Sequence, residues 1–564
     1  MSGVLLWAWA LTLPGLVLTG LGVGRRPGSA SLAGPGVLLV VAVTWLLGSR
    51  TAAELRQVDW LPFLPDGAFH LRGDALAAVM LAVLGFVSLC VYVYSLAYMA
   101  DEPPAGQRRF FMYLDFFVAS MAILVLAGNL AVLLIGWAGV GLASFLLISF
   151  WLDRPGTLGA GLQALAANAV GDAALLVAIV LVPAGCGDLL TLQTPACLAV
   201  PGGARLTASL LLVAAAAKSA QGPLYFWLPS AMAGPTPISA LIHAATMVAA
   251  GVYLLVRTNA LLAAAPPVAV ATAALGVATA LGGGLASLQQ ANFKRGLAYS
   301  TVSQLGYMFA GVGFGAPFAA IFHLVTHASF KALLFLSAGV VIHARDGEEE
   351  LAALGGLRRA LPGAYAAFLV GSLALVGLPG LSGALSKDAI LDAGEQANLL
   401  LAVCLFGGTF LTGLYIGRLF FGVFHGPRPD EQPIHHPSPL LLWPLVPLAV
   451  GAVVAGYLEW PAGLLSSALG ETAGHAEPVR FASPFGFFAG LLGVFGFALS
   501  GWRGREQAAE PVRVGTDAGW VGAVARRGYG LADRLAAIHS GRLGRYALAS
   551  VFGIAIILLI GLRA

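Results

Sequence analysis

Residues 214–229 read AAAAKSAQGPLYFWLP, an apolar helical run that holds Lys218 and is followed by Pro223. A proline removes a backbone hydrogen-bond donor and breaks the helix ladder. Residues 375–391, LVGLPGLSGALSKDAIL, show the same combination, because a proline precedes Lys387 inside another apolar run. Broken helices that carry polar groups at membrane depth are typical of ion sites in transporters. The two stretches therefore predict a membrane protein that moves ions.

The composition of the whole chain agrees with this interpretation. The chain has 564 residues, of which 59% are hydrophobic and 10% charged, and its mean hydropathy is +0.87. Soluble domains carry about 25% charged residues. The composition therefore excludes a disordered chain, a soluble enzyme and a nucleic-acid binder. The four cysteines have no metal-binding spacing, and there is no nucleotide-binding motif. We expect no metal and no cofactor on this chain.

About sixteen segments are long and apolar enough to cross a bilayer, which takes about 20 residues. In approximate bounds they are 4–22, 32–48, 75–97, 110–127, 129–151, 162–183, 206–228, 235–256, 267–287, 296–314, 316–344, 363–392, 398–424, 440–459, 484–502 and 546–562. Lys and Arg are more frequent in loops that follow odd-numbered spans, which places both termini on the outer side of the membrane. The sequence predicts an all-α, multi-pass protein of a prokaryotic inner (plasma) membrane.

Three of the four lysines fall within predicted spans: Lys218, Lys331 and Lys387. A lysine at the bilayer centre costs a few kcal/mol, and burial favours its neutral form. A single such lysine could form a structural ion pair or extend its amine to the interface. Three in one chain favour a role in proton movement.

A polar stripe lies between the broken helices. In residues 321–335, IFHLVTHASFKALLF, the side chains of His323, His327 and Lys331 follow one another at intervals of four and share one helix face. His243 lies on a neighbouring predicted span. Two histidines at this spacing could bind a metal, but no third ligand lies nearby in the sequence. We therefore predict that these residues and the other two lysines form a proton relay along the membrane midplane.

Three aspartates also fall within spans: Asp115, Asp172 and Asp388. Each is a possible acidic partner of a lysine or a buried, hydrogen-bonded structural residue. Asp388 directly follows Lys387, and consecutive residues of a helix do not face each other.

The two broken helices are five spans apart, which predicts two inverted repeats of five helices each, with breaks at Pro223 and Pro379. The expected units are three N-terminal helices, a first repeat, a second inverted repeat, two further helices, a short cytoplasmic connector with an amphipathic helix, and a last transmembrane helix. Their bounds are 1–109, 110–257, 258–426, 427–502, 503–545 and 546–564.

Several stretches carry a family resemblance. They are RRFFMYLDFFVASMAILVLAGNL (108–130), LLIGWAGVGLASFLLISFW (133–151), AAKSAQGPLYFWLPSAMAGPTPISALIHAATMVAAGVYLLVR (216–257), KRGLAYSTVSQLGYM (294–308), AIFHLVTHASFKALLFLSAG (320–339), LPGLSGALSKDAIL (378–391), LYIGRLFFGVFHG (414–426) and HSGRLGRYALA (539–549). In this order they resemble the antiporter-like membrane subunits of respiratory complex I (NADH:quinone oxidoreductase), above all chain L. These subunits are related to Mrp-type cation/proton antiporters.

The resemblance implies sixteen helices, inverted repeats at spans 4–8 and 9–13 with spans 7 and 12 broken, and a proton path at the midplane. It assigns the relay to Lys218, His243, His323, His327, Lys331 and Lys387. It also implies that NADH, FMN, iron–sulfur clusters and quinone are bound by partner subunits. Those partners would be other antiporter-like subunits in the lipid bilayer and a hydrophilic redox arm.

Three departures from the family pattern bear on the mechanism. The family motif GWEGVG reads GWAGVG here, with Ala138 in place of a glutamate, and Ala169 stands where the family tends to have an arginine before VGD. We therefore expect Lys218 to lack its carboxylate, so that the first half-channel is either rewired or silent. The connector at 503–545 is shorter than the long amphipathic helix of chain L, which suggests a smaller or unusual complex.

Other functions use the same fold. The chain could belong to a cation/proton antiporter or to a proton-coupled inorganic-carbon uptake complex, or it could be a scaffold that no longer conducts ions. The cost of three intramembrane lysines argues against the scaffold. Cys186 and Cys197 share a loop that the predicted orientation places outside, where either a disulfide or two free thiols would be stable.

Overall fold

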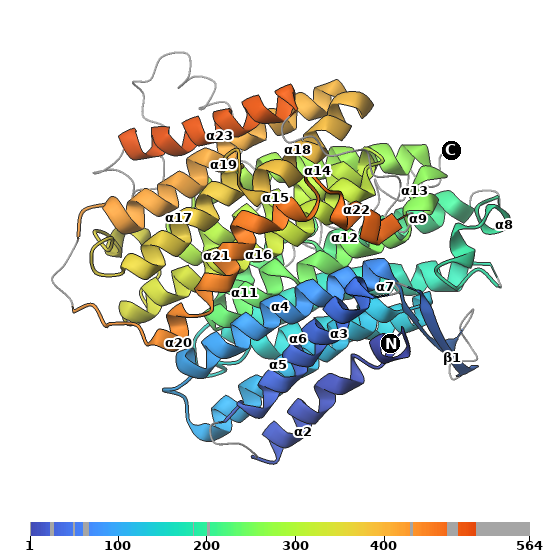
Figure 1. The fold of residues 1–564 in the computed structure, drawn as a ribbon, viewed down its shortest axis with the longest axis horizontal. Coiled ribbons are helices and arrows are strands. Elements are labelled where there is room, and N and C mark those ends of the chain that lie inside the picture. The colour runs from blue at the N-terminus through green and yellow to red at the C-terminus, as the bar shows by residue number, and fades with distance from the viewer. Residues whose placement is uncertain are drawn as a thin grey trace.

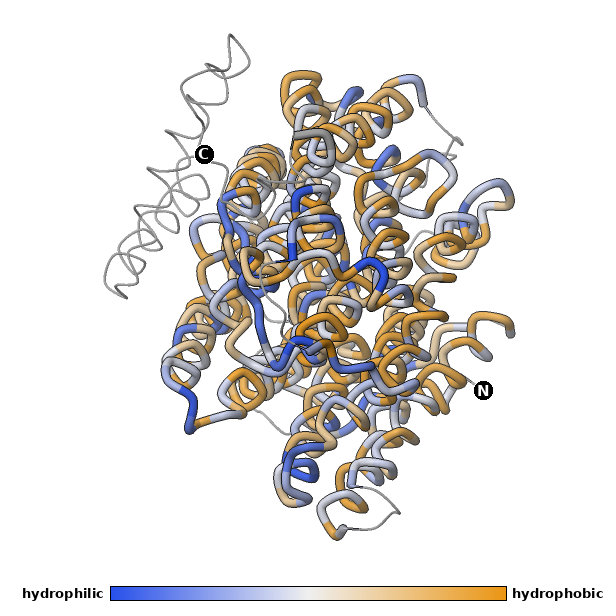
Figure 2. Tube along the Cα trace, turned by 90° about the vertical axis from the view of Figure 1, so that its left-hand side faces the viewer, coloured by the Kyte–Doolittle hydropathy of each residue, from blue (hydrophilic) through white to orange (hydrophobic). Residues whose placement is uncertain are grey.

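The computed structural model describes residues 2–22, 27–48, 51–59, 67–183, 185–199, 203–428, 433–470 and 483–503. Within them the chain is a bundle of roughly parallel helices, with α2 and α3 at one side and α19 and α23 at the other (Figure 1). Most positions along these helices are hydrophobic (Figure 2). The last predicted span, and the predicted connector beyond Arg503, lie outside the described residues.

Eleven of the described helical segments are long and apolar enough to cross a membrane. They coincide with eleven of the sixteen predicted spans. The other five differ for physical reasons: segment 4–22 forms short helices, 206–228 and 363–392 are interrupted, 296–314 is rich in polar side chains, and 546–562 lies outside the described residues. The multi-pass prediction is confirmed, whereas the number of sixteen spans stays a prediction.

The N-terminal part contains helices and a small sheet. Its elements are α1 (Ser2–Leu6), η1 (Ala10–Thr12), α2 (Leu13–Gly20), η2 (Ala30–Leu32), α3 (Ala33–Leu47), β1 (Ala53–Asp59), β2 (Ala68–Gly73) and α4 (Ala75–Tyr98). The two strands pair antiparallel, from Ala53 opposite Gly73 to Asp59 opposite Ala68. This hairpin was not predicted, since the sequence analysis expected helices and loops only.

The next helices include the first broken one. They are α5 (Pro104–Leu126), α6 (Leu130–Ile148), α7 (Thr157–Leu181), η3 (Thr191–Gln193), α8 (Pro195–Leu198), α9 (Gly203–Lys218), η4 (Leu224–Phe226), α10 (Trp227–Ser230), η5 (Ala231–Ala233), α11 (Thr236–Ala244) and α12 (Met247–Arg257). Pro223 lies between α9 and η4, where the break was predicted. A second interruption, between α11 and α12, was not predicted.

In the first half, three long continuous helices (α5, α6 and α7) precede the broken helix. The remaining elements show the same order, with α14, α15 and α16 before the second broken helix. These remaining elements are α13 (Asn259–Ala263), α14 (Pro266–Leu288), α15 (Phe293–Gly313), α16 (Pro317–Ala344), η6 (Leu351–Ala353), α17 (Pro362–Val376), α18 (Ser382–Ala397), α19 (Leu399–His425), α20 (Pro439–Leu442), α21 (Leu445–Val454), η7 (Ala455–Leu458), α22 (Leu464–Leu469) and α23 (Pro484–Arg503). Pro379 lies between α17 and α18, as predicted.

The centre of the bundle is formed by α11, α12 and α16. The most apolar windows of Thr236–Arg257 and Pro317–Ala344 are entirely buried, unlike those of the peripheral helices. Close packing between helices depends on small residues, as is usual in membranes. A Cβ atom at Gly276 of α14 would lie 2.6 Å from the carbonyl oxygen of Gly306 of α15, so both positions require glycine.

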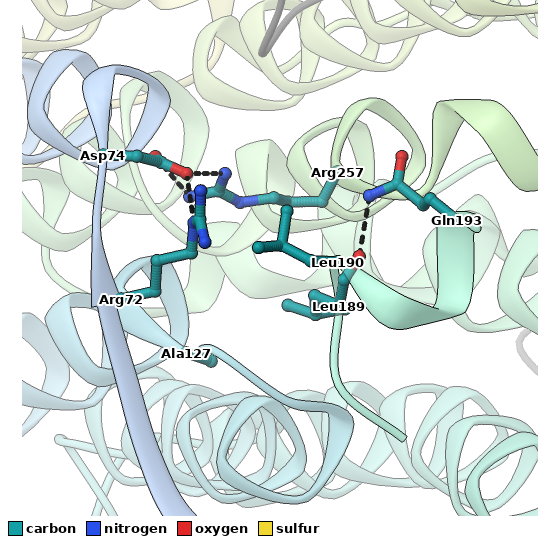
Figure 3. A pocket seen from close by; sticks show the side chains of 7 residues that line it. All are labelled: Arg72, Asp74, Ala127, Leu189, Leu190, Gln193 and Arg257. Carbon is teal, nitrogen blue, oxygen red and sulfur yellow. Dashed lines mark hydrogen bonds and ion pairs between the residues drawn. The ribbon is translucent and has the colours of Figure 1, made fainter. Parts of the chain in front are cut away.

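An ion-pair network ties the hairpin to the end of α12. Asp74 caps α4 by accepting a hydrogen bond from the Ala77 N–H at 3.0 Å. The Arg257 guanidinium binds both Asp74 carboxylate oxygens, at 2.5 and 2.8 Å, and the Arg72 Nε donates to Asp74 at 3.1 Å. Figure 3 shows these groups beside a pocket of about 260 Å³. Arg257 also donates to the Tyr253 hydroxyl at 2.9 Å.

This network fixes the charge of Asp74. Burial by itself would raise the pKa of the Asp74 carboxyl, but the charge and hydrogen bonds of Arg257, with smaller effects of Ala77 and Arg72, lower it to about 2. The stabilisation that Asp74 provides is therefore complete above the ordinary carboxyl pKa of about 4 and is lost as the pH falls towards 2.

A loop near the hairpin is closed by a disulfide between Cys186 and Cys197. The structure thus selects the disulfide over the two free thiols. The loop is held to β2 by an ion pair of 2.8 Å between the His70 Nδ1 and Asp188. Burial favours the neutral acid of Asp188, but hydrogen bonds from His70 and from two backbone N–H groups outweigh it and lower the pKa of Asp188.

Replacing Arg257 tests the network. The Arg257→Met variant leaves the Asp74 carboxylate buried without its main partner, so we expect a loss of about 3–5 kcal/mol at neutral pH, measured by unfolding in detergent. The loss should shrink as the pH falls towards 2, where the Asp74 carboxyl becomes protonated in both proteins. The matched control is Arg295→Met, which removes an exposed arginine. Equal stability of the two variants would show that the Arg257 pair is unimportant.

The disulfide can be tested with a membrane-impermeant thiol reagent on intact cells. We expect Cys186 and Cys197 to be labelled only after reduction, because their sulfur atoms are bonded to each other. Cys90 is buried and serves as an internal control that should react in neither state. Equal labelling of Cys186 and Cys197 before and after reduction would contradict the bond.

Candidate functional site

The six predicted relay residues all lie inside the bundle. Each side chain is at most 3% exposed. They come from four elements: Lys218 is the last residue of α9, His243 lies on α11, His323, His327 and Lys331 lie on α16, and Lys387 lies on α18. Their helices contact one another, since α16 packs against α11, α12, α15 and α18, and α12 packs against α9. The site therefore extends through the centre of the bundle.

Lys218 has a carboxylate partner. Its Nζ lies 3.4 Å from the Asp172 Oδ1 of α7, and 5.4 Å from the centre of the Trp137 ring of α6. The expectation that this lysine lacks a carboxylate is therefore wrong: a carboxylate is supplied by α7 rather than by α6. A Cβ atom at Gly141 would lie 2.9 Å from the Lys218 Nζ, so the missing side chain at Gly141 makes room for the amine.

The two positions that depart from the family pattern face outward. Ala138 and Ala169 are both exposed, on α6 and α7 respectively, whereas Lys218 is fully buried. The Asp172 side chain is 27% exposed, so its exposure lies between that of the two alanines and that of Lys218. The Lys218–Asp172 pair thus joins a buried amine to a partly exposed carboxyl group.

The middle of the site combines histidines with unsatisfied nitrogens. Among the described residues, neither ring nitrogen of His243 has a hydrogen-bond partner, and the His327 Nε2 has none. The His243 ring packs on Phe335, with ring centres 4.6 Å apart. The Lys331 Nζ donates to the Ser300 hydroxyl at 2.5 Å. Buried polar atoms are nearly always hydrogen-bonded, so these unpartnered nitrogens distinguish the middle of the site from the rest of the core.

His323 is held by two polar neighbours. Its Nδ1 lies 2.9 Å from the Ser386 hydroxyl of α18, and its Nε2 lies 3.3 Å from the Gln304 Oε1 of α15. Ser386 also contacts the Thr326 hydroxyl at 2.7 Å. The ring centres of His323 and His327 are 6.1 Å apart. The two imidazole rings are therefore neighbours on one face of α16, and His323 is oriented by its partners on α15 and α18.

Lys387 lies in the second turn of α18, just beyond the break that separates this helix from α17. Its Nζ donates to the Leu375 carbonyl at 2.7 Å and lies 5.3 Å from the centre of the Tyr307 ring. Leu375 belongs to the last turn of α17, whose final carbonyls lack partners within the helix. The C-terminal end of a helix carries a partial negative charge, so the break in the helix provides a site for an ammonium.

The other two aspartates accept hydrogen bonds from groups other than the lysines. Asp115 accepts hydrogen bonds from Ser31 and Tyr92, at 2.5 and 3.0 Å. Asp388 accepts from the Ser483 N–H at 2.7 Å and from the Ser483 hydroxyl at 2.5 Å, at the start of α23. Of the three possible acidic partners, only Asp172 forms an ion pair with a lysine among the described residues.

Sequence analysis missed the polar residues that contact the six predicted residues. Ser300, Gln304 and Tyr307 lie on α15, and Ser386 lies on α18. Three of them recur at intervals of four and three residues in the stretch KRGLAYSTVSQLGYM, which places them on one helix face. That spacing was visible in the sequence and would have identified α15 as the second polar helix of the site.

Comparisons with known proteins agree with this architecture. Residues 127–412 match the family described as "NADH:quinone oxidoreductase/Mrp antiporter, TM". The chain belongs to this family. Residues 65–111 also match the family described as "NADH-Ubiquinone oxidoreductase (complex I), chain 5 N-terminus". The matched residues of the first family include all six members of the candidate relay.

Curated relatives have related names. NADH-quinone oxidoreductase subunit L of Mycobacterium tuberculosis is 41% identical over 466 residues, which cover 80% of this chain and 73% of the relative. Subunit L of Escherichia coli is 42% identical, covering 77% and 71%. NADH-ubiquinone oxidoreductase chain 5 of Metridium senile is 39% identical, covering 84% and 82%. The predicted resemblance to complex I subunits is confirmed.

A solved structure shares the fold. The Mrp complex from Dietzia sp. DQ12-45-1b contains a chain that superposes with a TM-score of 0.78 at 28% identity. The superposition covers 99% of this chain and 63% of that chain. The chain thus spans less than two thirds of the length of its Mrp neighbour.

The space beside Lys218 can be tested by filling it. Gly141→Ala places a methyl group 2.9 Å from the Lys218 Nζ, so we expect the amine to move from Asp172 at a cost of about 1–3 kcal/mol, measured by thermal unfolding. The control Gly159→Ala adds a methyl group that meets nothing within 4 Å. In a Lys218→Met background the cost should shrink. An equal cost in both backgrounds would show that the effect of Gly141→Ala does not depend on Lys218.

Proposed function

We propose that this chain is the proton-translocating membrane subunit of an NADH:quinone oxidoreductase (complex I-like) assembly. Protons move along the Lys218, His243, Lys331, His327, His323 and Lys387 row and are driven by redox chemistry in partner subunits. The observation that carries the proposal is the row of six buried amines and imidazoles, in which both His243 ring nitrogens and the His327 Nε2 have no hydrogen-bond partner among the described residues. Ionisable groups inside a membrane bundle are expensive and typically mark ion pathways.

The proposed relay needs groups that both bind and release protons. An amine or imidazole does so when water or another titratable group lies within reach. His243 and His327 supply nitrogens that have no partner among the described residues, and Ser300 supplies a hydroxyl that contacts Lys331. Each protonation state of Lys331 therefore has a neighbour that can accept or return the proton through one bridging water.

The repeat arrangement is part of the proposal. We assign the first repeat to residues 110–257 and the second, inverted repeat to residues 258–426. In each repeat the fourth span is the broken helix. The order of helices in the two halves supports this assignment. Lys218 is the last residue before the first break, and Lys387 lies beyond the second break but donates to the Leu375 carbonyl at the C-terminal end of α17, so each amine lies close to the C-terminal end of a half-helix.

We assign NADH, FMN, the iron–sulfur clusters and quinone to partner subunits, and we place both termini on the outer side of the membrane. The names of the relatives, which are subunits of quinone oxidoreductases, support the first assignment. The positive-inside rule supports the second. Other antiporter-like subunits and a hydrophilic redox arm are the expected partners.

The structural neighbour favours a second candidate function. Because the fold matches a chain of an Mrp complex, the protein is alternatively the membrane subunit of a cation/proton antiporter or of a proton-coupled inorganic-carbon uptake complex. Purification of the tagged protein in mild detergent, followed by mass spectrometry of its partners, separates these functions. Quinone-site and iron–sulfur subunits support the first, whereas small antiporter subunits or a soluble zinc protein support the second.

Alanine substitutions test the relay. We expect Lys331→Ala and Lys387→Ala to reduce proton pumping into vesicles at least about tenfold while the complex still assembles, since a positioned proton carrier contributes large rate factors. Lys294→Ala is the matched control, because Lys294 is the only lysine outside the row and pairs with Glu349 at 2.7 Å. Unchanged pumping in both relay variants would refute the relay.

The Lys218–Asp172 pair decides whether the first half-channel works. If it does, Lys218→Ala and Asp172→Asn should reduce pumping to a similar extent, because the two groups act as one ion pair. Normal pumping in both variants would mean that this half-channel is silent.

A further inference from the structure

A pocket of about 260 Å³ lies between β2, η3 and the end of α12, apart from the Lys/His row. Its lining includes Arg72 and Asp74 on one side and Gln193 on the other (Figure 3). The Gln193 amide is fixed there, because its Nε2 donates to the Leu189 carbonyl at 2.7 Å. Sites for drug-sized ligands measure roughly 300–1,000 Å³. The pocket is therefore suited to a small group rather than to a nucleotide or a redox cofactor.

The Asp74 carboxylate in this pocket has no free acceptor site. A carboxylate offers about four lone-pair sites to donors. The Asp74 Oδ1 accepts from the Ala77 N–H and the Arg257 Nη2, and the Oδ2 accepts from the Arg257 Nη1 and the Arg72 Nε. All four sites are thus occupied, so this acid has no lone pair left for a metal cation or for the donor of a ligand.

The two guanidinium groups of the lining keep unused donors. Each guanidinium carries five N–H bonds. Arg257 uses three of them, two on Asp74 and one on the Tyr253 hydroxyl. Arg72 uses two, one on Asp74 and one on Glu54. Five N–H bonds of the pair therefore have no acceptor among the described residues. The pocket has donors in excess, which is the pattern of an anion site.

The charge of the lining also favours an anion. Two arginines and one aspartate give the lining a net charge of +1. Glu54 is not part of the lining and binds Arg72 with a side chain that is 48% exposed, so it competes with a ligand without filling the pocket. Asp188, which precedes η3, is already paired with His70 at 2.8 Å. A phosphate group fits such a site, because its oxygens accept pairs of N–H bonds from guanidinium groups.

The pocket lies at the level expected for lipid headgroups. Asp74 directly precedes the candidate span Ala75–Tyr98, and Arg257 is the last residue of the candidate span Thr236–Arg257. Headgroup phosphates lie at the ends of spanning helices, and basic pockets between such helices are typical headgroup sites. Leu190, which also lines the pocket, is 47% exposed. It offers an apolar contact to the glycerol and acyl carbons that follow a lipid phosphate.

We propose that this pocket binds a phosphate group through the unused N–H bonds of Arg72 and Arg257. The phosphate belongs to a membrane phospholipid or is free in solution, and both sources present the same oxygens to the two arginines. The bound group joins the hairpin to the end of α12. The site does not depend on the proposed function, because it rests on the lining of the pocket alone.

Titrations of the purified protein, together with the subunits that co-purify, test the site. Dihexanoylphosphatidylglycerol or inorganic phosphate is added in maltoside detergent at constant ionic strength, and the rise of the unfolding temperature gives the affinity. Arg72→Gln should weaken binding about tenfold, because it removes a charged donor. The matched control is Arg56→Gln, which removes the same charge from an exposed residue of β1 and should leave the affinity unchanged. Equal affinities of the two variants would overturn the proposal.

A second variant keeps the test independent of the folding of Arg72→Gln. Glu54→Gln removes the carboxylate that competes for Arg72, so the affinity should rise several-fold. The two variants are thus expected to move the affinity in opposite directions, which general damage to the fold would not do. Unchanged or weaker binding in Glu54→Gln would overturn the proposal.

The choice of ligands identifies the source of the phosphate. Saturation by inorganic phosphate assigns the site to free phosphate, whereas saturation by the phospholipid alone assigns it to a lipid headgroup. Dihexanoylglycerol carries the same acyl chains without the phosphate and should not bind. If it binds as tightly as the phospholipid, or if neither phosphate ligand binds, the proposal is wrong.

Discussion

The need to satisfy every backbone polar group inside the membrane governs this structure. Lipid offers no hydrogen bonds, so a broken helix is tolerated only where protein or water supplies partners. At the first break, the Gln221 N–H binds the Ala216 carbonyl at 2.8 Å, the Trp227 indole binds the Ala217 carbonyl at 2.9 Å, and the Gly222 N–H binds the Thr279 hydroxyl at 3.1 Å. Each break is therefore surrounded by other helices, and the lysine beside it is buried with it.

The same requirement gives the three lysines different surroundings. Lys218 faces the carboxyl group of Asp172, Lys331 faces the Ser300 hydroxyl, and Lys387 faces a carbonyl at the end of a half-helix. The three amines thus have an acid, a hydroxyl and a backbone carbonyl as their respective partners. A row of unequal sites can shift a proton in one direction when a change in a partner alters one of them, which identical sites would not do.

Much of this architecture could be predicted from the sequence, because its causes are local. Apolar length sets the spans, proline sets both breaks, and spacing by four places His323, His327 and Lys331 on one face. The partner of Lys218 could not be predicted, because Asp172 and Lys218 are far apart in the sequence and meet only when α7 packs on α9. The hairpin escaped prediction because its short strands depend on the pairing of Arg72, Asp74 and Arg257, not on a hydrophobic pattern.

The two substitutions relative to the family pattern are best understood together. Ala138 stands where the resemblance implies an acid and Ala169 where it implies a base, so the two differences cancel in net charge. Both alanines are exposed, whereas Lys218 is buried, so neither position supplies the partner of this lysine in the structure. The carboxyl group that Lys218 contacts comes from Asp172 of α7, at 3.4 Å, and the buried amine therefore has an acidic partner without a glutamate on α6.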